Sequence, residues 1–152
     1  MDSPASSETT NTANSAQAKA LTQRFWDTLY RRDWEALAGF FGPESTYTDV
    51  PTPADDVAVG SEQILRRLRL GLEPITGYEH QLIQVVCEST TVVTEHTETW
   101  RWNTGEEVVL PFMSVQETDG EIITRWCDYW DLQTLLGAAP QWWIEHIMVG
   151  WQ

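Results

Sequence analysis

The sequence predicts a single α+β domain. Helical spacing comes first along the chain, strand-like alternation runs from Gly77 over four segments, and helical spacing returns after Asp131. The 152 residues are enough to bury one hydrophobic core, and no apolar run approaches the ~20 residues of a membrane-spanning helix. We therefore expect one soluble domain over residues 16–152, preceded by a disordered tail at 1–15.

Composition and charge narrow the possible partners. Nine basic against 23 acidic residues give a net charge of −14, which argues against nucleic acid, since phosphate binding depends on Lys and Arg. Cys87 and Cys127 are too few and too far apart for a disulfide scaffold or a close metal-ligand pair, which favours a reduced, cytoplasmic protein. The first residues lack the basic start and apolar stretch of a secretory signal. Neither nucleic acid nor membrane is expected as a partner.

Two helices open the domain. The first carries apolar residues at helical spacing from Ala18 to Leu29, and Asp33 can cap a second, short helix that Gly42-Pro43 ends. The second helix has three apolar residues on one face: Trp34, Leu37 and Phe41.

A short strand and a third helix follow. Ser45–Val50 is rich in β-branched residues and places Tyr47 and Asp49 on one face. After a proline-containing loop at 51–60, a helix from Ser61 has an apolar stripe of Ile64, Leu65, Leu68 and Leu72. Its three arginines are expected on the solvated outer face: Arg66, Arg67 and Arg69.

The remaining chain predicts an antiparallel meander with a helical end. Asn103–Gly105 and Asp119-Gly120 mark reversals between strands. Helical spacing returns at Leu132, Leu135 and Leu136, and an apolar segment around Trp142, Trp143, Ile144 and Ile147 is expected to pack on the sheet or on a partner.

Two strands place polar residues on apolar faces, which is costly unless it serves a purpose. In Thr91–Trp102, alternation puts His96 and Glu98 in line with two tryptophans. In Glu121–Asp131, one face carries Ile122, Thr124, Trp126, Asp128 and Trp130. If these faces line one concavity, the chain forms a pocket that contains an acid and a base, because carboxyl groups in apolar surroundings acquire raised and separated pKa values.

Other interpretations of these residues stay open. A one-residue slip in register would place His96 and Glu98 on the solvated face as an ion pair. A metal site from Asp49, His96, Glu98 and Asp128 is chemically possible, but no second histidine stands at ligand spacing. We interpret His80 and His146 as structural and assign no chemistry to Cys127.

Three segments resemble the signature segments of the limonene-1,2-epoxide hydrolase family. They are Tyr47-Thr48-Asp49, Thr94-Glu95-His96-Thr97-Glu98 and Trp126-Cys127-Asp128-Tyr129-Trp130-Asp131. The resemblance implies a curved, cone-like α+β fold, shared with ketosteroid isomerase and scytalone dehydratase, in which an antiparallel-rich mixed sheet wraps around the N-terminal helices and forms a deep apolar pocket. It also implies a homodimer and a reaction without metal or other cofactor.

The resemblance implies a role for each matching position. Asp128 would be the general base and Tyr47 would orient a water molecule that attacks an epoxide. Glu98 stands where the family has the aspartic acid that protonates the epoxide oxygen, and His96 stands where it has an arginine that bridges the two acids. Asp49 stands where the family has an asparagine that helps to hold the attacking water. Histidine bridges two acids only while protonated, and an aspartate in place of the amide raises the pKa of at least one neighbouring carboxyl group.

The leading expectation is therefore cofactor-independent hydrolysis of a bulky apolar epoxide to a vicinal diol. Four tryptophans are expected in the pocket wall: Trp100, Trp102, Trp126 and Trp130. One alternative is an isomerase or cyclase that uses the same acid and base without water, which the replaced asparagine favours. The other is a binding protein without catalysis.

Overall fold

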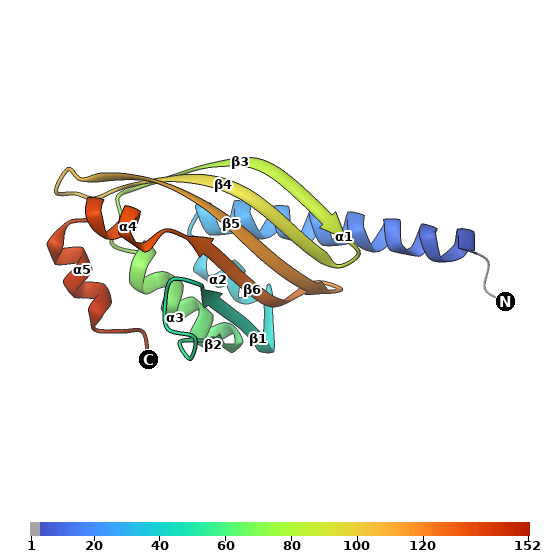
Figure 1. Cartoon of the computed structure of the whole chain (residues 1–152). Helices are drawn as coiled ribbons and strands as arrows, with labels where there is room; N and C mark the ends of the chain where they lie inside the picture. The colour runs from blue at the N-terminus through green and yellow to red at the C-terminus, as the bar shows by residue number, and fades with distance from the viewer. Residues whose placement is uncertain (1–3) are drawn as a thin grey trace.

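The computed structural model describes the backbone of residues 4–152 as an α+β fold around a curved six-stranded sheet (Figure 1). The helices are α1 (Pro4–Tyr30), α2 (Trp34–Ala38), α3 (Gly60–Leu72), α4 (Leu132–Ala138) and α5 (Gln141–Met148). The strands are β1 (Phe41–Asp49), β2 (Ala58–Val59), β3 (Gly77–Glu88), β4 (Thr91–Arg101), β5 (Glu107–Asp119) and β6 (Ile122–Trp130). The predicted fold class is confirmed.

Strand order explains how distant segments meet. The sheet runs β2-β1-β6-β5-β4-β3, with β1 parallel to β6 and every other pair antiparallel. The parallel pairing brings an early strand beside a late one, so that Asp49 is the register partner of Asp128. Two residues 79 positions apart in sequence thus become neighbours in space.

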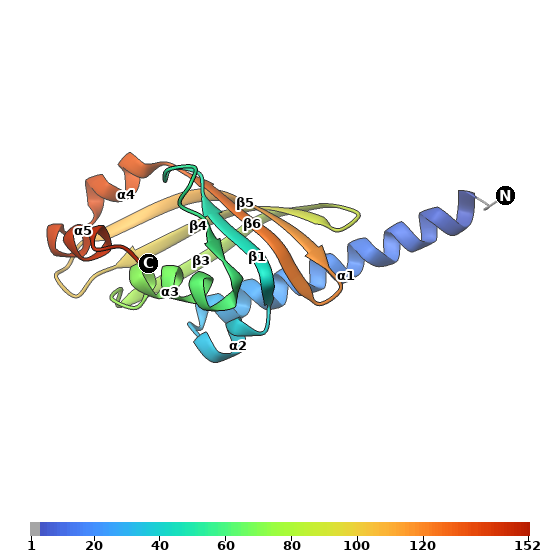
Figure 2. The same cartoon turned by 90° about the horizontal axis from the view of Figure 1, so that it is seen from below.

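The helices cover the concave face of the sheet, and α4 and α5 lie at one end (Figures 1 and 2). The predicted inward face of β4 is confirmed, because its residues alternate between buried and half-buried along the whole strand. Phe25, Trp26 and Leu29 of α1 pack into one hydrophobic core with the inward-facing side chains of the sheet. Among residues 4–152, no helix is both long and apolar enough to cross a membrane.

The N-terminal segment differs from its prediction. Helix α1 begins at Pro4, so residues 4–15 are helical and not disordered, while residues 1–3 lie outside the described part of the chain. The helix extends past the sheet, and side chains 7–13 are exposed (Figure 2). The prediction relied on polarity, but residues 5–30 contain no Gly or Pro that would end a helix.

Two strand details also differ from prediction. Phe41 belongs to β1 instead of the second helix, and Gly42-Pro43 lies within that strand at an irregularity in its pairing with β6. In β6, the register against β5 skips Thr124. This β-bulge buries Ile123 and leaves Ile122 and Thr124 exposed, so these two do not share the face of Trp126 and Asp128.

Candidate active site

A cavity of about 250 Å³ lies between the concave face of the sheet and the helices. Most of its wall is aromatic or aliphatic, with Trp26, Leu68, Leu110, Phe112 and Trp143 among the lining side chains. The polar side chains in the wall are Tyr47, Asp49, Thr52, Asp56, Arg67, Tyr78, Glu98 and Asp128. A cavity that is largely apolar, with a few convergent polar groups, is typical of a small-molecule site.

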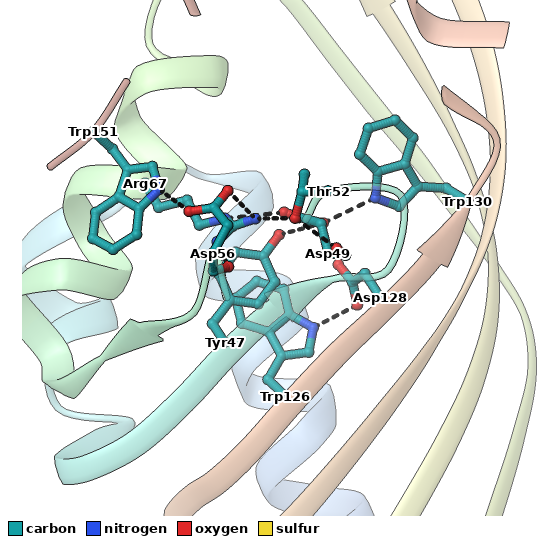
Figure 3. A network of polar contacts seen from close by, with 9 residues as sticks. All are labelled: Tyr47, Asp49, Thr52, Asp56, Arg67, Trp126, Asp128, Trp130 and Trp151. Carbon is teal, nitrogen blue, oxygen red and sulfur yellow. Dashed lines mark hydrogen bonds and ion pairs between the residues drawn. The ribbon is translucent and has the colours of Figure 1, made fainter. Parts of the chain in front are cut away.

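Asp49 and Asp128 form one side of the polar group (Figure 3). Asp128 accepts a hydrogen bond of 2.6 Å from Trp126 Nε1. Asp49 Oδ1 accepts hydrogen bonds of 2.9 Å from both the Tyr47 hydroxyl and Trp130 Nε1. The parallel pairing of β1 with β6 therefore places two carboxyl groups side by side, with Asp128 buried and Asp49 half-buried.

The two carboxyl groups differ in what surrounds them. Burial, and then the charge of Asp49, raise the pKa of Asp128 well above its ordinary value, against the lowering effect of hydrogen bonds from Ser114 and Trp126. Burial also raises the pKa of Asp49, but Arg67 and the hydrogen bonds from Trp130 and Tyr47 oppose the rise. Of the two, Asp49 lies beside the cation Arg67, so the surroundings favour the charged form at Asp49 and the protonated form at Asp128.

Glu98 forms a second polar centre. Its Oε1 accepts hydrogen bonds from the hydroxyls of Tyr30 and Tyr78, the latter at 2.9 Å, and its Oε2 accepts one of 2.8 Å from Trp100 Nε1. Burial raises the pKa of Glu98 from 4.5 to about 6, against the lowering effect of these three donors. Glu98 is consequently a carboxylate at neutral pH.

Asp128 and Glu98 reach the cavity from separate strands. Strand β5 lies between β4 and β6, which places the two strands roughly 10 Å apart at the usual interstrand spacing. The two residues are also offset along the strand direction. Asp128 is aligned with Ser114 of β5, which is aligned with Thr94 of β4, and Thr94 lies four residues before Glu98. Asp128 and Glu98 thus line the same cavity with space between them for a ligand.

Most of the predicted site residues meet in this cavity. Those that line it are Tyr47, Asp49, Glu98, Asp128, Trp100, Trp126 and Trp130. Trp102 is not in the wall; it is buried against Trp100 and Trp143, at ring-centroid distances of 6.1 Å and 5.5 Å. It supports the wall from behind.

His96 does not occupy the bridging position that the resemblance implies. Its ring is fully buried outside the cavity wall, stacked on Phe112, with hydrogen bonds to Thr94 at 2.6 Å and to His80 at 2.8 Å. Burial, and then His80, lower the pKa of His96 to about 3. A neutral imidazole that bonds neither Glu98 nor Asp128 cannot act as a cationic bridge between them.

Three polar residues of the site are not predicted from the sequence. Tyr30 and Tyr78, which hold Glu98, carried no motif. Arg67 was expected on the solvated face, but its side chain is only 7% exposed and forms an ion pair with Asp49 at 3.1 Å. Helical periodicity contained the signal, because residue 67 lies three positions after Ile64 and so belongs to the same buried stripe.

A metal site finds no support in the described residues. Among residues 4–152, no three His, Cys, Asp or Glu side chains are grouped so that they could hold a metal ion. The four residues considered from the sequence divide among the Asp49–Asp128 pair, the Glu98 centre and the histidine pair behind the wall.

Fold and site together define a cone-shaped α+β protein with carboxyl groups in a largely apolar cavity. The chain belongs to the SnoaL-like domain family, whose model matches residues 22–126. No curated protein matches the sequence.

Solved structures of similar fold are described as enzymes with different activities. An LEH-like epoxide hydrolase from M. tuberculosis is 21% identical, with a TM-score of 0.69, over 81% of this chain and 89% of that one. A protein from Shewanella putrefaciens CN-32, provisionally described as a SnoaL-like polyketide cyclase, is 18% identical, with a TM-score of 0.71, over 80% and 95%. One from Kribbella flavida, provisionally described as a ketosteroid isomerase, is 18% identical, with a TM-score of 0.62, over 78% and 80%. At these identities the likeness shows the fold and not the reaction.

Proposed function

We propose that this protein is an acid–base enzyme that hydrolyses a bulky apolar epoxide to a vicinal diol, without a cofactor. The observation that carries the proposal is the presence of Asp128 and Glu98 in one cavity with mostly apolar walls, where different neighbours surround the two carboxyl groups. Acid and base catalysis near neutral pH needs two groups whose pKa values are pushed apart by their surroundings. The resemblance to limonene-1,2-epoxide hydrolases supports the choice of an epoxide.

The electrostatics favour roles opposite to those that the resemblance implies. Glu98 removes a proton from water, and the water oxygen attacks an epoxide carbon while the carbon–oxygen bond of the ring breaks. Asp128, whose pKa is raised by burial and by the neighbouring charge of Asp49, gives its proton to the departing oxygen. Glu98 then loses a proton to solvent and Asp128 regains one, so the net reaction adds one water to the substrate.

One observation favours a second candidate, an isomerase or cyclase that uses the same acid and base without water. The resemblance assigns the positions of Tyr47 and Asp49 to holding water, but here the two side chains bond each other at 2.9 Å. Asp49 also accepts hydrogen bonds from Trp130 and Arg67. The pair therefore has less capacity to hold a water molecule.

Product analysis in ¹⁸O-labelled water separates the candidates. We expect the wild-type protein to convert members of a panel of bulky epoxides into diols that carry one ¹⁸O. Asp128→Asn and Glu98→Gln should each lower the rate by at least about 100-fold, the low end for general acid–base catalysis. Asp131→Asn is the matched control, because Asp131 is a solvent-exposed helix cap three residues from Asp128.

The other outcomes contradict hydrolysis in different ways. Products with the mass of the substrate and no ¹⁸O would indicate the isomerase or cyclase. Tight binding of apolar ligands without any turnover, unchanged in both variants, would indicate a binding protein.

A further inference from the structure

Arg67 carries a buried positive charge that the proposed reaction does not use. It lies on α3, and its side chain is 7% exposed. A charge is costly to bury unless it is paired and hydrogen-bonded, so its partners indicate what it does.

The guanidinium connects the cavity to the segment that follows β1 (Figure 3). Arg67 Nε donates to Asp49 Oδ2 at 3.1 Å. Its Nη1 donates to the backbone oxygen of Asp56 at 2.6 Å, and its Nη2 donates to Thr52 Oγ1 at 3.1 Å. The Asp56 carboxylate is 3.4 Å from Nη2.

Aromatic rings cover this ion pair. The guanidinium carbon lies 5.2 Å from the centre of the Tyr47 ring and 5.8 Å from that of Trp151. Because the rings exclude water, the attraction between Arg67 and Asp49 is stronger than at an exposed site. Three directional hydrogen bonds fix the guanidinium, so that within the Asp49–Asp128 pair its attraction acts on Asp49.

We propose that Arg67 is a positioning residue, which assigns the proton shared by Asp49 and Asp128 to Asp128. Two adjacent buried carboxyl groups do not readily ionise together, and the one beside a cation becomes the anion. Arg67 contacts Asp49, and no ion pair joins it to Asp128. The inference rests on the proposed function, because it explains how Asp128 remains available as the acid.

The other groups that face the carboxyl pair cannot do this. Glu98 of β4 raises the pKa of Asp128, and Asp56, after β1, faces Arg67 with a further negative charge. Tyr47 and Trp130 donate to Asp49 as neutral groups. Arg67 of α3 is the cation in direct contact with the pair.

Carboxyl ¹³C NMR titration of protein labelled at aspartate tests the inference without a substrate, with Asp49→Asn and Asp128→Asn as assignment variants. In the wild type, we expect Asp49 to ionise at lower pH and Asp128 to stay protonated at pH 7. Arg67→Met should raise the midpoint of Asp49 by about 1–3 pH units, a change of about 10- to 1000-fold in its ionisation constant. Arg67→Lys should give a smaller rise, since the positive charge remains.

Arg66→Met on the same helix is the control, because Arg66 is exposed and pairs with Glu62; it should leave both midpoints unchanged. Should Arg67→Met fail to fold, Asp49→Asn replaces it, and the midpoint of Asp128 should then fall because the neighbouring charge is gone. An unmoved Asp49 midpoint in Arg67→Met, an ionised Asp128 at pH 7, or an unmoved Asp128 midpoint in Asp49→Asn would each overturn the inference. If the midpoints behave as expected and no diol forms, hydrolysis fails while the placement of the proton stands.

Discussion

Glu98 is ionised in the folded protein only at an energetic cost. Its pKa rises from 4.5 to about 6 because burial outweighs three hydrogen-bond donors. The folded state therefore binds a proton more tightly than the unfolded state, so stability falls as pH rises from about 4.5 to 6 and stays lower above that range. The difference corresponds to about 2 kcal/mol.

This cost predicts that Glu98→Gln stabilises the fold above pH 6. Glutamine removes the buried charge and retains an oxygen that accepts hydrogen bonds from Tyr30 and Tyr78. Its amide nitrogen cannot accept the bond from Trp100 Nε1, but a protonated Glu98 also presents a donor on one of its two oxygens. We expect the free energy of unfolding at pH 8 to increase by up to about 2 kcal/mol, with a much smaller effect at pH 4. Chemical denaturation at the two pH values measures it, with the exposed Glu121→Gln as control. Equal effects at both pH values would contradict the prediction.

Individual residues differ in how far the sequence could place them. Asp128 and Glu98 were identified because a carboxyl group between tryptophans on an alternating strand needs a reason to be buried. His96 was placed correctly on the inward face, but its partners were not: the ring meets His80 from β3, and strand pairing decided that contact. Arg67 differs from its prediction: composition alone places all three arginines of α3 on the solvated face, whereas helical spacing distinguishes position 67 from 66 and 69.

At the level of elements, regular segments were the predictable ones. Strand β4 alternates without interruption, so one phase fits all its residues. Strand β6 contains the bulge at Thr124. It shifts the alternation of inward and outward side chains before Trp126, while Asp128 still points inward. Single-residue insertions of this kind leave no mark on an alternating pattern, so the sequence alone could not reveal the exposed Ile122.

The segment from α5 to Trp151 forms part of the cavity wall and is therefore expected to limit the size of the ligand. Trp143 of α5 and Trp151 both line the cavity. Trp143 Nε1 donates to the Gly71 oxygen at 3.0 Å, and Trp151 Nε1 donates to Asp56 Oδ1 at 3.0 Å. These bonds hold the segment from α5 to Trp151 against α3 and the segment after β1.

Trp151→Ala should therefore enlarge the range of ligands. Removing the indole deletes part of the wall, and we expect apolar ligands too large for the wild type to bind at least about tenfold more tightly. Displacement of a fluorescent apolar probe by ligands of graded size measures this. Trp151→Phe retains a ring and should stay closer to the wild type, and the half-exposed Trp142→Ala, on α5 outside the cavity lining, should have no effect. An unchanged size limit in Trp151→Ala would show that this side chain does not restrict the cavity.

At the scale of the whole molecule, the outer face of the sheet exposes several large apolar side chains. Alternation places residues there that point away from the cavity, among them the large apolar side chains Val86, Val109, Met113 and Tyr129, which are 45–54% exposed. Met113 and Tyr129 are register partners on β5 and β6, so they form adjoining parts of one patch. Extended apolar patches on a protein surface are typical of association sites.

We predict that two copies of the chain associate through this face, as the resemblance to dimeric families implies. Light scattering should then give about twice the chain mass of 17.4 kDa. Added salt should strengthen the association, because it screens the repulsion between two chains that each carry a charge of −14.

Met113→Lys should dissociate the pair, since it buries an unpaired charge in the contact. It should leave apolar-ligand binding intact, because the cavity is on the opposite face. Glu121→Lys, an exposed change in the β5–β6 turn, is the control for the added positive charge. A wild-type protein that remains at the mass of one chain at high concentration and high salt would contradict this arrangement.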